Sequence, residues 1–135
     1  HPGEFDRLAD PLAIDDSPTD PATRPAAACR LAQLHHAVVA LKGHHTVVTD
    51  GQQQFINDTG GPALSTGGTG DVLTGLIAAL IAQGMDLLDA AALGIHAHGL
   101  AADRWSEQHG PAGMLARHLA DGIPDALNQL RSASP

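Results

Sequence analysis

A glycine-rich segment directly before an apolar run holds the residues of this chain whose types and spacing could do chemistry. It reads Thr66-Gly-Gly-Thr-Gly-Asp71, and residues 72–82 after it are apolar apart from Thr74 and Gly75. Glycines lack a Cβ, so successive backbone N–H groups can turn toward a ligand and approach it closely. A helix that begins here directs its free N–H groups and the positive end of its dipole at the same point. The segment therefore predicts an anion site suited to phosphate.

Asp71 gives that segment a second chemical feature. A carboxylate is unhelpful for holding phosphate, but it is well placed to take a proton from a hydroxyl that attacks one. The structural alternative is a glycine-rich turn with a helix-stabilising Asp in the first turn, and the glycines alone leave both interpretations open. The segment is not a P-loop, because no Gly-Lys-Ser/Thr follows, and it lacks the third-glycine spacing of a dinucleotide fingerprint.

The elements expected before this segment are a helix and three strands. A proline-rich loop at residues 10–25 precedes the helix, which is expected at 26–35. The strands are expected at 38–41, buried on both faces, at 46–49, and at 53–57, which returns after a hairpin turn at Asp50-Gly51. The N-terminal His-Pro-Gly-Glu is expected to be turn-like.

The elements expected after it are helices. Residues 58–70 are too rich in Gly, Thr and Pro for regular structure, and residues 71–83 predict a helix that is apolar nearly all round and hence buried. Gly84 is expected to end that helix, and Asp86 to cap the next one, which runs to about residue 107. A last helix is expected at about 112–130, broken at Pro124, with a frayed end at 131–135.

Composition limits the classes of protein this chain could be. Its 135 residues, 43% hydrophobic and 16% charged, suit one globular domain with its own core. The formal net charge of −8 and the aromatic content of 2% argue against nucleic-acid binding and against a polybasic membrane surface.

Cysteine usage and hydropathy indicate a cytoplasmic protein. The single cysteine, Cys29, excludes a disulfide framework within the chain and a cysteine-based zinc site, and we expect it to be a buried, inert thiol. No apolar stretch approaches the roughly 20 residues that a membrane span needs. No signal peptide is recognisable.

Four segments, in order along nearly the whole chain, resemble one known family. The longest runs from Asn57 to Gly75 and includes the glycine-rich segment; the others are His1-Pro-Gly-Glu4, Leu41-Lys42-Gly43-His-His-Thr46 and Ile95-His-Ala-His98-Gly99-Leu-Ala-Ala-Asp103. Together they resemble the ADP-dependent NAD(P)H-hydrate dehydratases, which are ribokinase-like enzymes that repair hydrated nicotinamide cofactors. The sequence departs from the family pattern at Gly61, where Asn is usual, and at Ala63, where Gly is usual.

The resemblance implies an α/β fold of the ribokinase-like three-layer α/β/α type. We expect residues 1–135 to be the C-terminal portion of a single such domain, since the chain starts at His1 rather than Met and the family's N-terminal strands have no counterpart in it. Such a portion alone is expected to fold or act poorly.

The resemblance also implies a reaction and a set of site residues. NADH hydrate or NADPH hydrate in its S form is phosphorylated on the ring hydroxyl, and phosphate then leaves. Asp71 is the expected general base and substrate contact, and His1 contacts the nicotinamide end. The donor is ADP, with ATP as the alternative, accompanied by Mg²⁺ held mostly by substrate and water. The expected nucleotide-binding residues are Lys42, Gly43, His44, His45, Thr46, Gly68, Thr69 and Gly70.

Other candidates carry less weight. His35 and His36 are adjacent, as are His44 and His45, and we expect the rings of each pair to diverge. His96 and His98 do not share a helix face. We therefore expect surface or packed histidines and no protein-bound metal. We expect a homo-oligomer, with Trp105 as a packing residue and candidate subunit contact. Two rival functions stay open: a ribokinase-like small-alcohol kinase acting on a vitamin precursor, and an inactive half-domain that only oligomerises.

Overall fold

The chain divides into two compact units, residues 1–58 and 59–135, each with its own contacts. The computed structural model describes residues 1–9 and 14–133. The parts of the predicted proline-rich loop at 10–13 and of the predicted C-terminal end at 134–135 lie outside the described residues.

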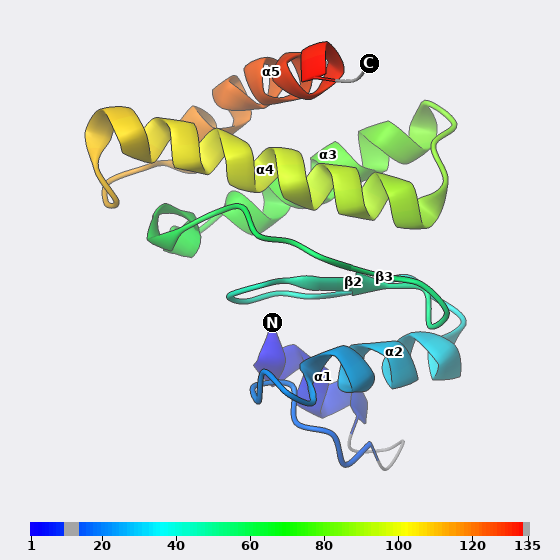
Figure 1. Ribbon diagram of the computed structural model, residues 1–135. Coiled ribbons are helices and arrows are strands. Elements are labelled where there is room, and N and C mark those ends of the chain that lie inside the picture. The colour runs from blue at the N-terminus through cyan, green and yellow to red at the C-terminus, as the bar shows by residue number, and fades with distance from the viewer. Residues whose placement is uncertain (10–13, 134–135) are drawn as a thin grey trace. The chain divides into compact units, whose positions relative to one another are not determined.

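The first unit packs two helices with a small antiparallel sheet (Figure 1). Its elements are α1 (Pro2–Ala9), α2 (Arg24–His35), β1 (Val39–Leu41), β2 (Val47–Thr49) and β3 (Gln54–Ile56). The sheet order is β1-β2-β3, and Val48 at its centre pairs with Ala40 on one side and Phe55 on the other. Helix α2 packs against β1 and β2. The predicted helix and three strands are therefore confirmed, with shifts of one or two residues at their ends.

Helix α1 is an element that the sequence analysis missed. The expected turn at His-Pro-Gly-Glu is instead its first turn, with Pro at the start, Glu4 near the start and Arg7 near the end. These are ordinary helix signals, and Phe5 and Ala9, four residues apart, are buried on one face. They join a core with residues of α2 and the sheet: Ala27, Ala28, Leu31, Leu41 and Val47.

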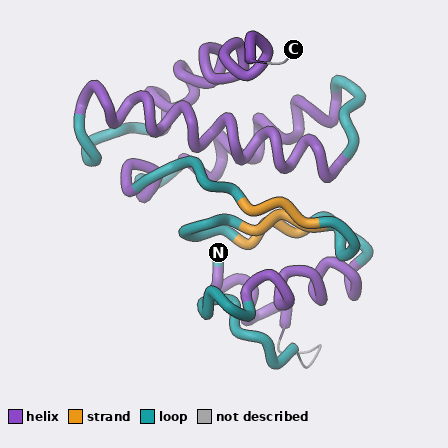
Figure 2. The backbone as a smooth tube through the Cα atoms, viewed as in Figure 1, coloured by secondary structure: helices purple, strands orange, loops and turns teal. Residues whose placement is uncertain are grey.

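The hairpin between β2 and β3 forms where Asp50-Gly51 predicts it (Figure 2). The Asp50 carboxylate accepts hydrogen bonds from the backbone N–H groups of Gln52 and Gln53, at 2.8 and 2.7 Å. Gly51 has φ +92°, and a Cβ there would lie 3.1 Å from the backbone nitrogen of Gln33. The turn thus needs glycine both for its conformation and for its contact with α2.

The prediction of a first strand buried on both faces is wrong for β1. Val39 and Ala40 are only half-buried, whereas all three residues of β2 are buried. The physical reason is position, because β1 is an edge strand of the described sheet and β2 lies in its centre.

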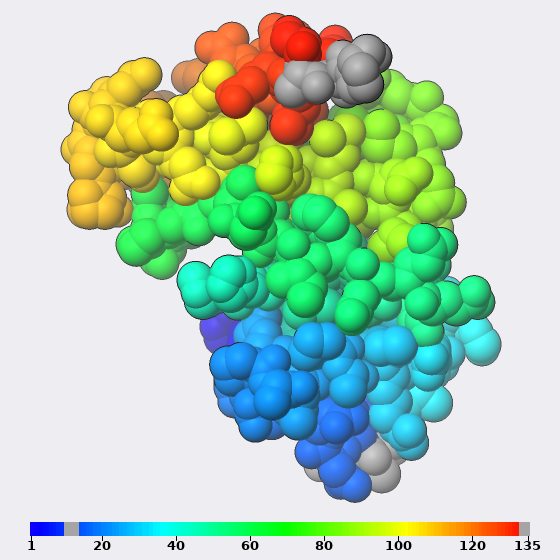
Figure 3. All heavy atoms as spheres, in the orientation of Figure 1, coloured from blue at the N-terminus to red at the C-terminus, as the bar shows by residue number. Residues whose placement is uncertain are grey.

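The second unit is helical. It contains the 3₁₀ turn η2 (Pro62–Ser65), α3 (Thr69–Ala82), α4 (Leu87–His109) and α5 (Ala116–Ala133). Helix α4 packs against both α3 and α5, and Figure 3 shows α5, in orange and red, lying directly on the yellow part of α4. Alanines on α4 let the helices approach closely. The core of this unit consists of Ala63, Ala97, Ala101, Ala102, Met114, Leu119, Ile123 and Ala126.

Helix α3 differs from the prediction at its start and in its burial. It begins at Thr69 rather than Asp71, and η2 occupies part of the stretch expected to be irregular. Only Thr69, Leu73 and Leu80 are buried, and Ile81 is 38% exposed, so the prediction of a buried helix is wrong for the described chain. Within the second unit, α4 and α5 cover one side of α3, and no described element of that unit covers the other side.

The last two helices confirm one boundary signal and correct another. The Asp86 side chain caps α4 as predicted, accepting from the Leu88 N–H at 2.9 Å. Helix α5 starts at Ala116, continues to Ala133 through the end expected to fray, and is not broken at Pro124. Leu119 and Ile123, buried against α4, offset the hydrogen bond that the proline removes. None of the described helices is long and apolar enough to cross a membrane.

Candidate anion-binding site

The start of α3 presents a row of unpaired backbone donors. Gly68 adopts φ +88° as the residue before the helix, and its carbonyl accepts the first helical bond from Val72, at 3.2 Å. In the described part of the chain, no acceptor pairs with the N–H groups of Gly67, Gly68, Gly70 and Asp71. Gly70 is half-buried and the other three are exposed. Four free donors at the positive end of a 14-residue helix form an electropositive cradle for an anion.

Thr69, in the middle of that row, faces the opposite way. Its side chain is buried, and its hydroxyl lies 2.9 Å from the carbonyl oxygens of both Leu64 and Thr66. Its N–H points at Thr66 as well, at 3.4 Å. The Thr69 side chain thus anchors the loop from within the unit. Its predicted contact with a nucleotide stays a prediction, and the hydroxyl, which is bonded to these two carbonyls, does not provide that contact.

Asp71 is the third residue of α3 and is exposed. No described residue forms a hydrogen bond or ion pair with its carboxylate. The carboxylate is therefore available to a ligand beside the N–H groups of Gly68 and Gly70, which is the placement that a base acting next to a phosphate requires.

Helix α4 holds the start of the segment that leads to the glycine-rich site, a role that sequence reasoning did not assign. The Asp103 carboxylate accepts from the Gly60 N–H at 2.8 Å, and the Thr59 hydroxyl donates to the His96 carbonyl at 2.9 Å. A Cβ on Gly99 would lie 2.8 Å from the Gly60 nitrogen, so only glycine fits there. The one signal that could have found these residues was the family resemblance of residues 95–103.

A second such contact joins α4 to the glycine-rich segment itself. His98 is buried, and its Nε2 lies 2.9 Å from the Thr69 carbonyl oxygen. The expectation of a packed histidine is confirmed at this position. Ala63, one of the two departures from the family pattern, is buried in the core of the same unit.

The other predicted nucleotide residues form a tight loop between β1 and β2 in the first unit. Gly43 has φ +149°, and its carbonyl accepts a hydrogen bond from the Thr46 hydroxyl at 3.0 Å. The Gly43 N–H in turn donates to the Thr46 hydroxyl oxygen at 3.3 Å. Lys42, Gly43, His44 and His45 are exposed, and Thr46 is half-buried. The rings of His44 and His45 do not diverge as expected, because His45 takes φ +55° and brings their centroids to 4.0 Å.

The buried Arg24 side chain supports this loop through hydrogen bonds to the backbone. Its side chain is 8% exposed, and its guanidinium donates to the carbonyls of Leu41 at 2.9 Å and Pro18 at 3.0 Å, with Lys42 at 3.4 Å. No acidic side chain among the described residues forms an ion pair with it. Burial lowers the pKa of Arg24 from its usual value, because the charged form is desolvated.

His1 begins the first unit and is exposed. Its imidazole Nδ1 accepts a hydrogen bond from the Gly3 N–H at 3.2 Å. His1 and Lys42 thus lie in one unit, and Gly68, Thr69, Gly70 and Asp71 lie in the other.

Several remaining candidates are placed outside these two groups. Trp105 packs against the core of the second unit, with its ring stacked on His109 at 4.7 Å and parallel to His118 at 6.1 Å. Cys29 is half-buried rather than buried, and its Sγ lies 3.2 Å from the Gly51 carbonyl oxygen. Among the described residues, no three His, Cys, Asp or Glu side chains converge on a point that could hold a metal ion.

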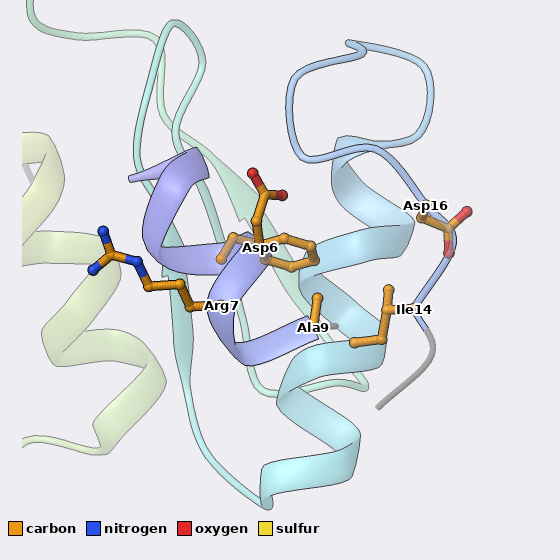
Figure 4. A pocket seen from close by; sticks show the side chains of 6 residues that line it. Asp6, Arg7, Ala9, Ile14 and Asp16 are labelled. Carbon is orange, nitrogen blue, oxygen red and sulfur yellow. The ribbon is translucent and has the colours of Figure 1, made fainter. Parts of the chain in front are cut away.

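A pocket in the first unit contains none of the predicted site residues. It is lined by Phe5, Asp6, Arg7 and Ala9 of α1 and by Ile14 and Asp16. In Figure 4, Ala9 and Ile14 lie next to each other, while Arg7 points away from Ile14 and Asp16. This pocket offers no convergent set of polar groups.

Comparison with known proteins connects the chain to a family. The fold matches a crystal structure of the ADP/ATP-dependent NAD(P)H-hydrate dehydratase of Bacillus subtilis, co-crystallised with ATP and Mg²⁺. The TM-score is 0.81 at 31% identity, over 96% of this chain and 46% of that chain. The predicted ribokinase-like α/β fold class is thereby confirmed.

Sequence comparison is more specific. The family described as NAD(P)H-hydrate dehydratase matches residues 1–125. The bifunctional NAD(P)H-hydrate repair enzyme Nnr of Moorella thermoacetica is 42% identical over 132 residues, which are 96% of this chain and 24% of that protein. The ADP-dependent (S)-NAD(P)H-hydrate dehydratase of Cenarchaeum symbiosum is 40% identical over 127 residues, which are 94% of this chain and 42% of that protein. The chain belongs to the NAD(P)H-hydrate dehydratase family and spans less than half the length of each of these relatives.

Proposed function

We propose that the protein carrying this chain is a lyase, an ADP-dependent (S)-NAD(P)H-hydrate dehydratase that returns hydrated NADH or NADPH to the reduced cofactor. The observation that carries this proposal is the family match over residues 1–125, because the matched residues include the free amides and the exposed Asp71 at the start of α3. We further propose that residues 1–135 are the C-terminal portion of a single domain, which is supported by coverage of less than half of each relative.

The reaction needs phosphorylation because hydroxide is a poor leaving group. The hydroxyl oxygen of the hydrate attacks the terminal phosphorus of ADP, and the bond from that phosphorus to the bridging oxygen breaks to release AMP. The ring-nitrogen lone pair then expels the phosphate ester as inorganic phosphate. The neighbouring ring carbon loses a proton, which restores the double bond. The sum is one hydrate and one ADP converted to one reduced cofactor, one AMP and one phosphate.

This chain's own residues supply binding and proton transfer. Asp71 takes the hydroxyl proton, and the N–H groups of Gly68 and Gly70 stabilise the charge on the transferring phosphoryl group. Residues 42–46 bind the AMP part of the donor, and His1 contacts the nicotinamide end of the substrate. A Mg²⁺ ion bound with the donor would be held mostly by substrate and water, and it would neutralise charge on the phosphates.

A product assay on the full-length protein tests this function. Hydrated NADH is incubated with Mg²⁺ and ADP, and the absorbance band of the reduced nicotinamide is followed together with AMP and free phosphate. A dehydratase forms NADH, AMP and phosphate in equal amounts. A small-alcohol kinase leaves the hydrate untouched and accumulates a stable phosphate ester of its own alcohol, because an ordinary alcohol has no ring nitrogen to expel phosphate. An inactive, oligomerising portion gives neither product.

A further inference from the structure

His98 on α4 controls one peptide plane of the anion-binding segment. The side chain is 7% exposed, and its Nε2 lies 2.9 Å from the Thr69 carbonyl oxygen. A carbonyl oxygen only accepts hydrogen bonds, so Nε2 carries the hydrogen and donates it. His98 and Thr69 are 29 residues apart in the chain, and the contact lies entirely within the second unit.

The Thr69 carbonyl and the Gly70 N–H belong to the same planar peptide group. The chain has no cis peptide bond among its described residues, so the two groups point in opposite directions across that plane. As the first residue of α3, Thr69 also accepts a hydrogen bond within the helix, so His98 is a second donor to its carbonyl. The two donors hold the carbonyl on one side of the plane and the Gly70 N–H on the other, where no described acceptor meets it. The Thr69 hydroxyl, held between Leu64 and Thr66, restrains the same residue from its side-chain end.

We propose that His98 is a positioning residue for phosphoryl transfer. By donating from Nε2 to the Thr69 carbonyl, it adds a restraint from α4 to the peptide plane whose Gly70 N–H binds the donor phosphate. This inference rests on the proposed function, and it gives a role to a histidine that touches neither nucleotide nor substrate. A helix packed on both sides is a rigid support for such a contact, because α4 also holds Gly60 through Asp103.

The expected effect of losing the donor is a weaker nucleotide site in a folded protein. In a His98→Leu variant of the full-length protein, the Thr69 carbonyl keeps only the hydrogen bond that it accepts within α3, and the direction of the Gly70 N–H is held less tightly. We expect Kd for ADP with Mg²⁺, measured by calorimetry, to rise about tenfold, the equivalent of about 1.4 kcal/mol. His98→Gln places an amide N–H near the position of Nε2, and we expect it to restore Kd to within about threefold of the wild type. His109→Leu, a change on the same helix beside Trp105, serves as the matched control and leaves Kd unchanged.

A spectroscopic readout separates positioning from general destabilisation. In the wild type and in His98→Gln, saturating ADP shifts the amide proton of Gly70 in NMR spectra, because that N–H gains a phosphate acceptor. In His98→Leu the shift is reduced at saturation. If the leucine variant fails to fold, His98→Asn replaces it with the same expectation, because its amide is too short to reach Thr69.

The outcomes distinguish this inference from the function beneath it. A wild-type protein that does not bind ADP overturns the proposed function and this inference together. A wild type that binds ADP, with folded His98→Leu or His98→Asn binding equally well, overturns the role of His98 alone. Failure of folded His98→Gln to restore binding also overturns that role.

Discussion

The Asp103 carboxylate binds the backbone N–H of Gly60 at 2.8 Å, across 43 residues of sequence. This bond fixes the start of the segment that leads through η2 to Asp71, while Gly99, one turn earlier on α4, leaves room for the same backbone. A helix with no proposed ligand contact of its own thus determines where the site residues lie.

Gly99→Ala tests how closely that segment approaches α4. A Cβ would lie 2.6 Å from the Thr59 carbonyl carbon and 2.8 Å from the Gly60 nitrogen, so the backbone must move. We expect a loss of about 1–3 kcal/mol in the free energy of unfolding, measured by urea denaturation. Gly122→Ala is the matched control, because its Cβ would meet Ala101 at an ordinary 3.5 Å. Equal stability of the two variants would contradict the close approach.

Asp71→Asn tests the proposed base. The amide cannot accept the hydroxyl proton, whereas the free N–H groups of the loop are unchanged, so we expect turnover to fall roughly 10²–10⁴-fold with little change in ADP affinity. Steady-state kinetics and calorimetry on the full-length protein measure the two effects. Asp89→Asn, in the first turn of α4, is the control for adding an amide at a helix start. Near-normal turnover in Asp71→Asn would remove this residue from the mechanism.

Gly70→Val tests the phosphate cradle. A branched side chain beside the free N–H groups blocks the approach of phosphate, and we expect ADP affinity to fall at least tenfold while the fold is kept. Gly75→Val in the same helix adds an equal side chain where nothing lies within 4 Å, so it reproduces the helix-propensity effect alone. Calorimetry that finds the same affinity in both variants would count against the cradle.

Arg24→Met tests the support beneath the Lys42–Thr46 loop. The variant keeps much of the buried aliphatic volume but removes the donors to Leu41 and Pro18. We expect the free energy of unfolding to fall by about 1.5–3 kcal/mol, the usual range for hydrogen bonds made by a charged group. Arg30→Met on the exposed side of α2 is the control. If Arg24→Met proves as stable as that control in urea, the guanidinium does not hold the loop.

Asp50 predicts a pH effect at the hairpin turn. The backbone N–H groups of Gln53 and then Gln52 bind its carboxylate and hold its pKa below the usual value. Because the folded pKa lies below the unfolded one, this stabilisation is present above the unfolded pKa and is lost as pH falls through the folded pKa. A ¹³C NMR titration of the Asp50 carboxyl should give a midpoint below that of the unfolded chain. In Asp50→Asn this contribution to the pH dependence of stability should disappear. An unshifted Asp50 midpoint in the wild-type protein would contradict the turn geometry.

The sequence alone determined the local elements and the chemistry of the loop. Glycine spacing before an apolar run predicted the free amides near α3, Asp50-Gly51 predicted the hairpin, and Asp86 predicted a cap, because each depends on groups a few residues apart. The family resemblance was carried by whole segments, and comparison with known proteins confirmed it.

Tertiary structure decided what depends on distant neighbours. The inward direction of Thr69 follows from the carbonyls of Leu64 and Thr66 and from His98. The position of Arg24 against Gly43 follows from the packing of α2 on β1. The exposure of α3 and the continuity of α5 through Pro124 likewise depend on which helices pack beside them, not on their own periodicity. A side chain's partners across 20 to 40 residues are set by how elements pack, and no local pattern encodes that packing.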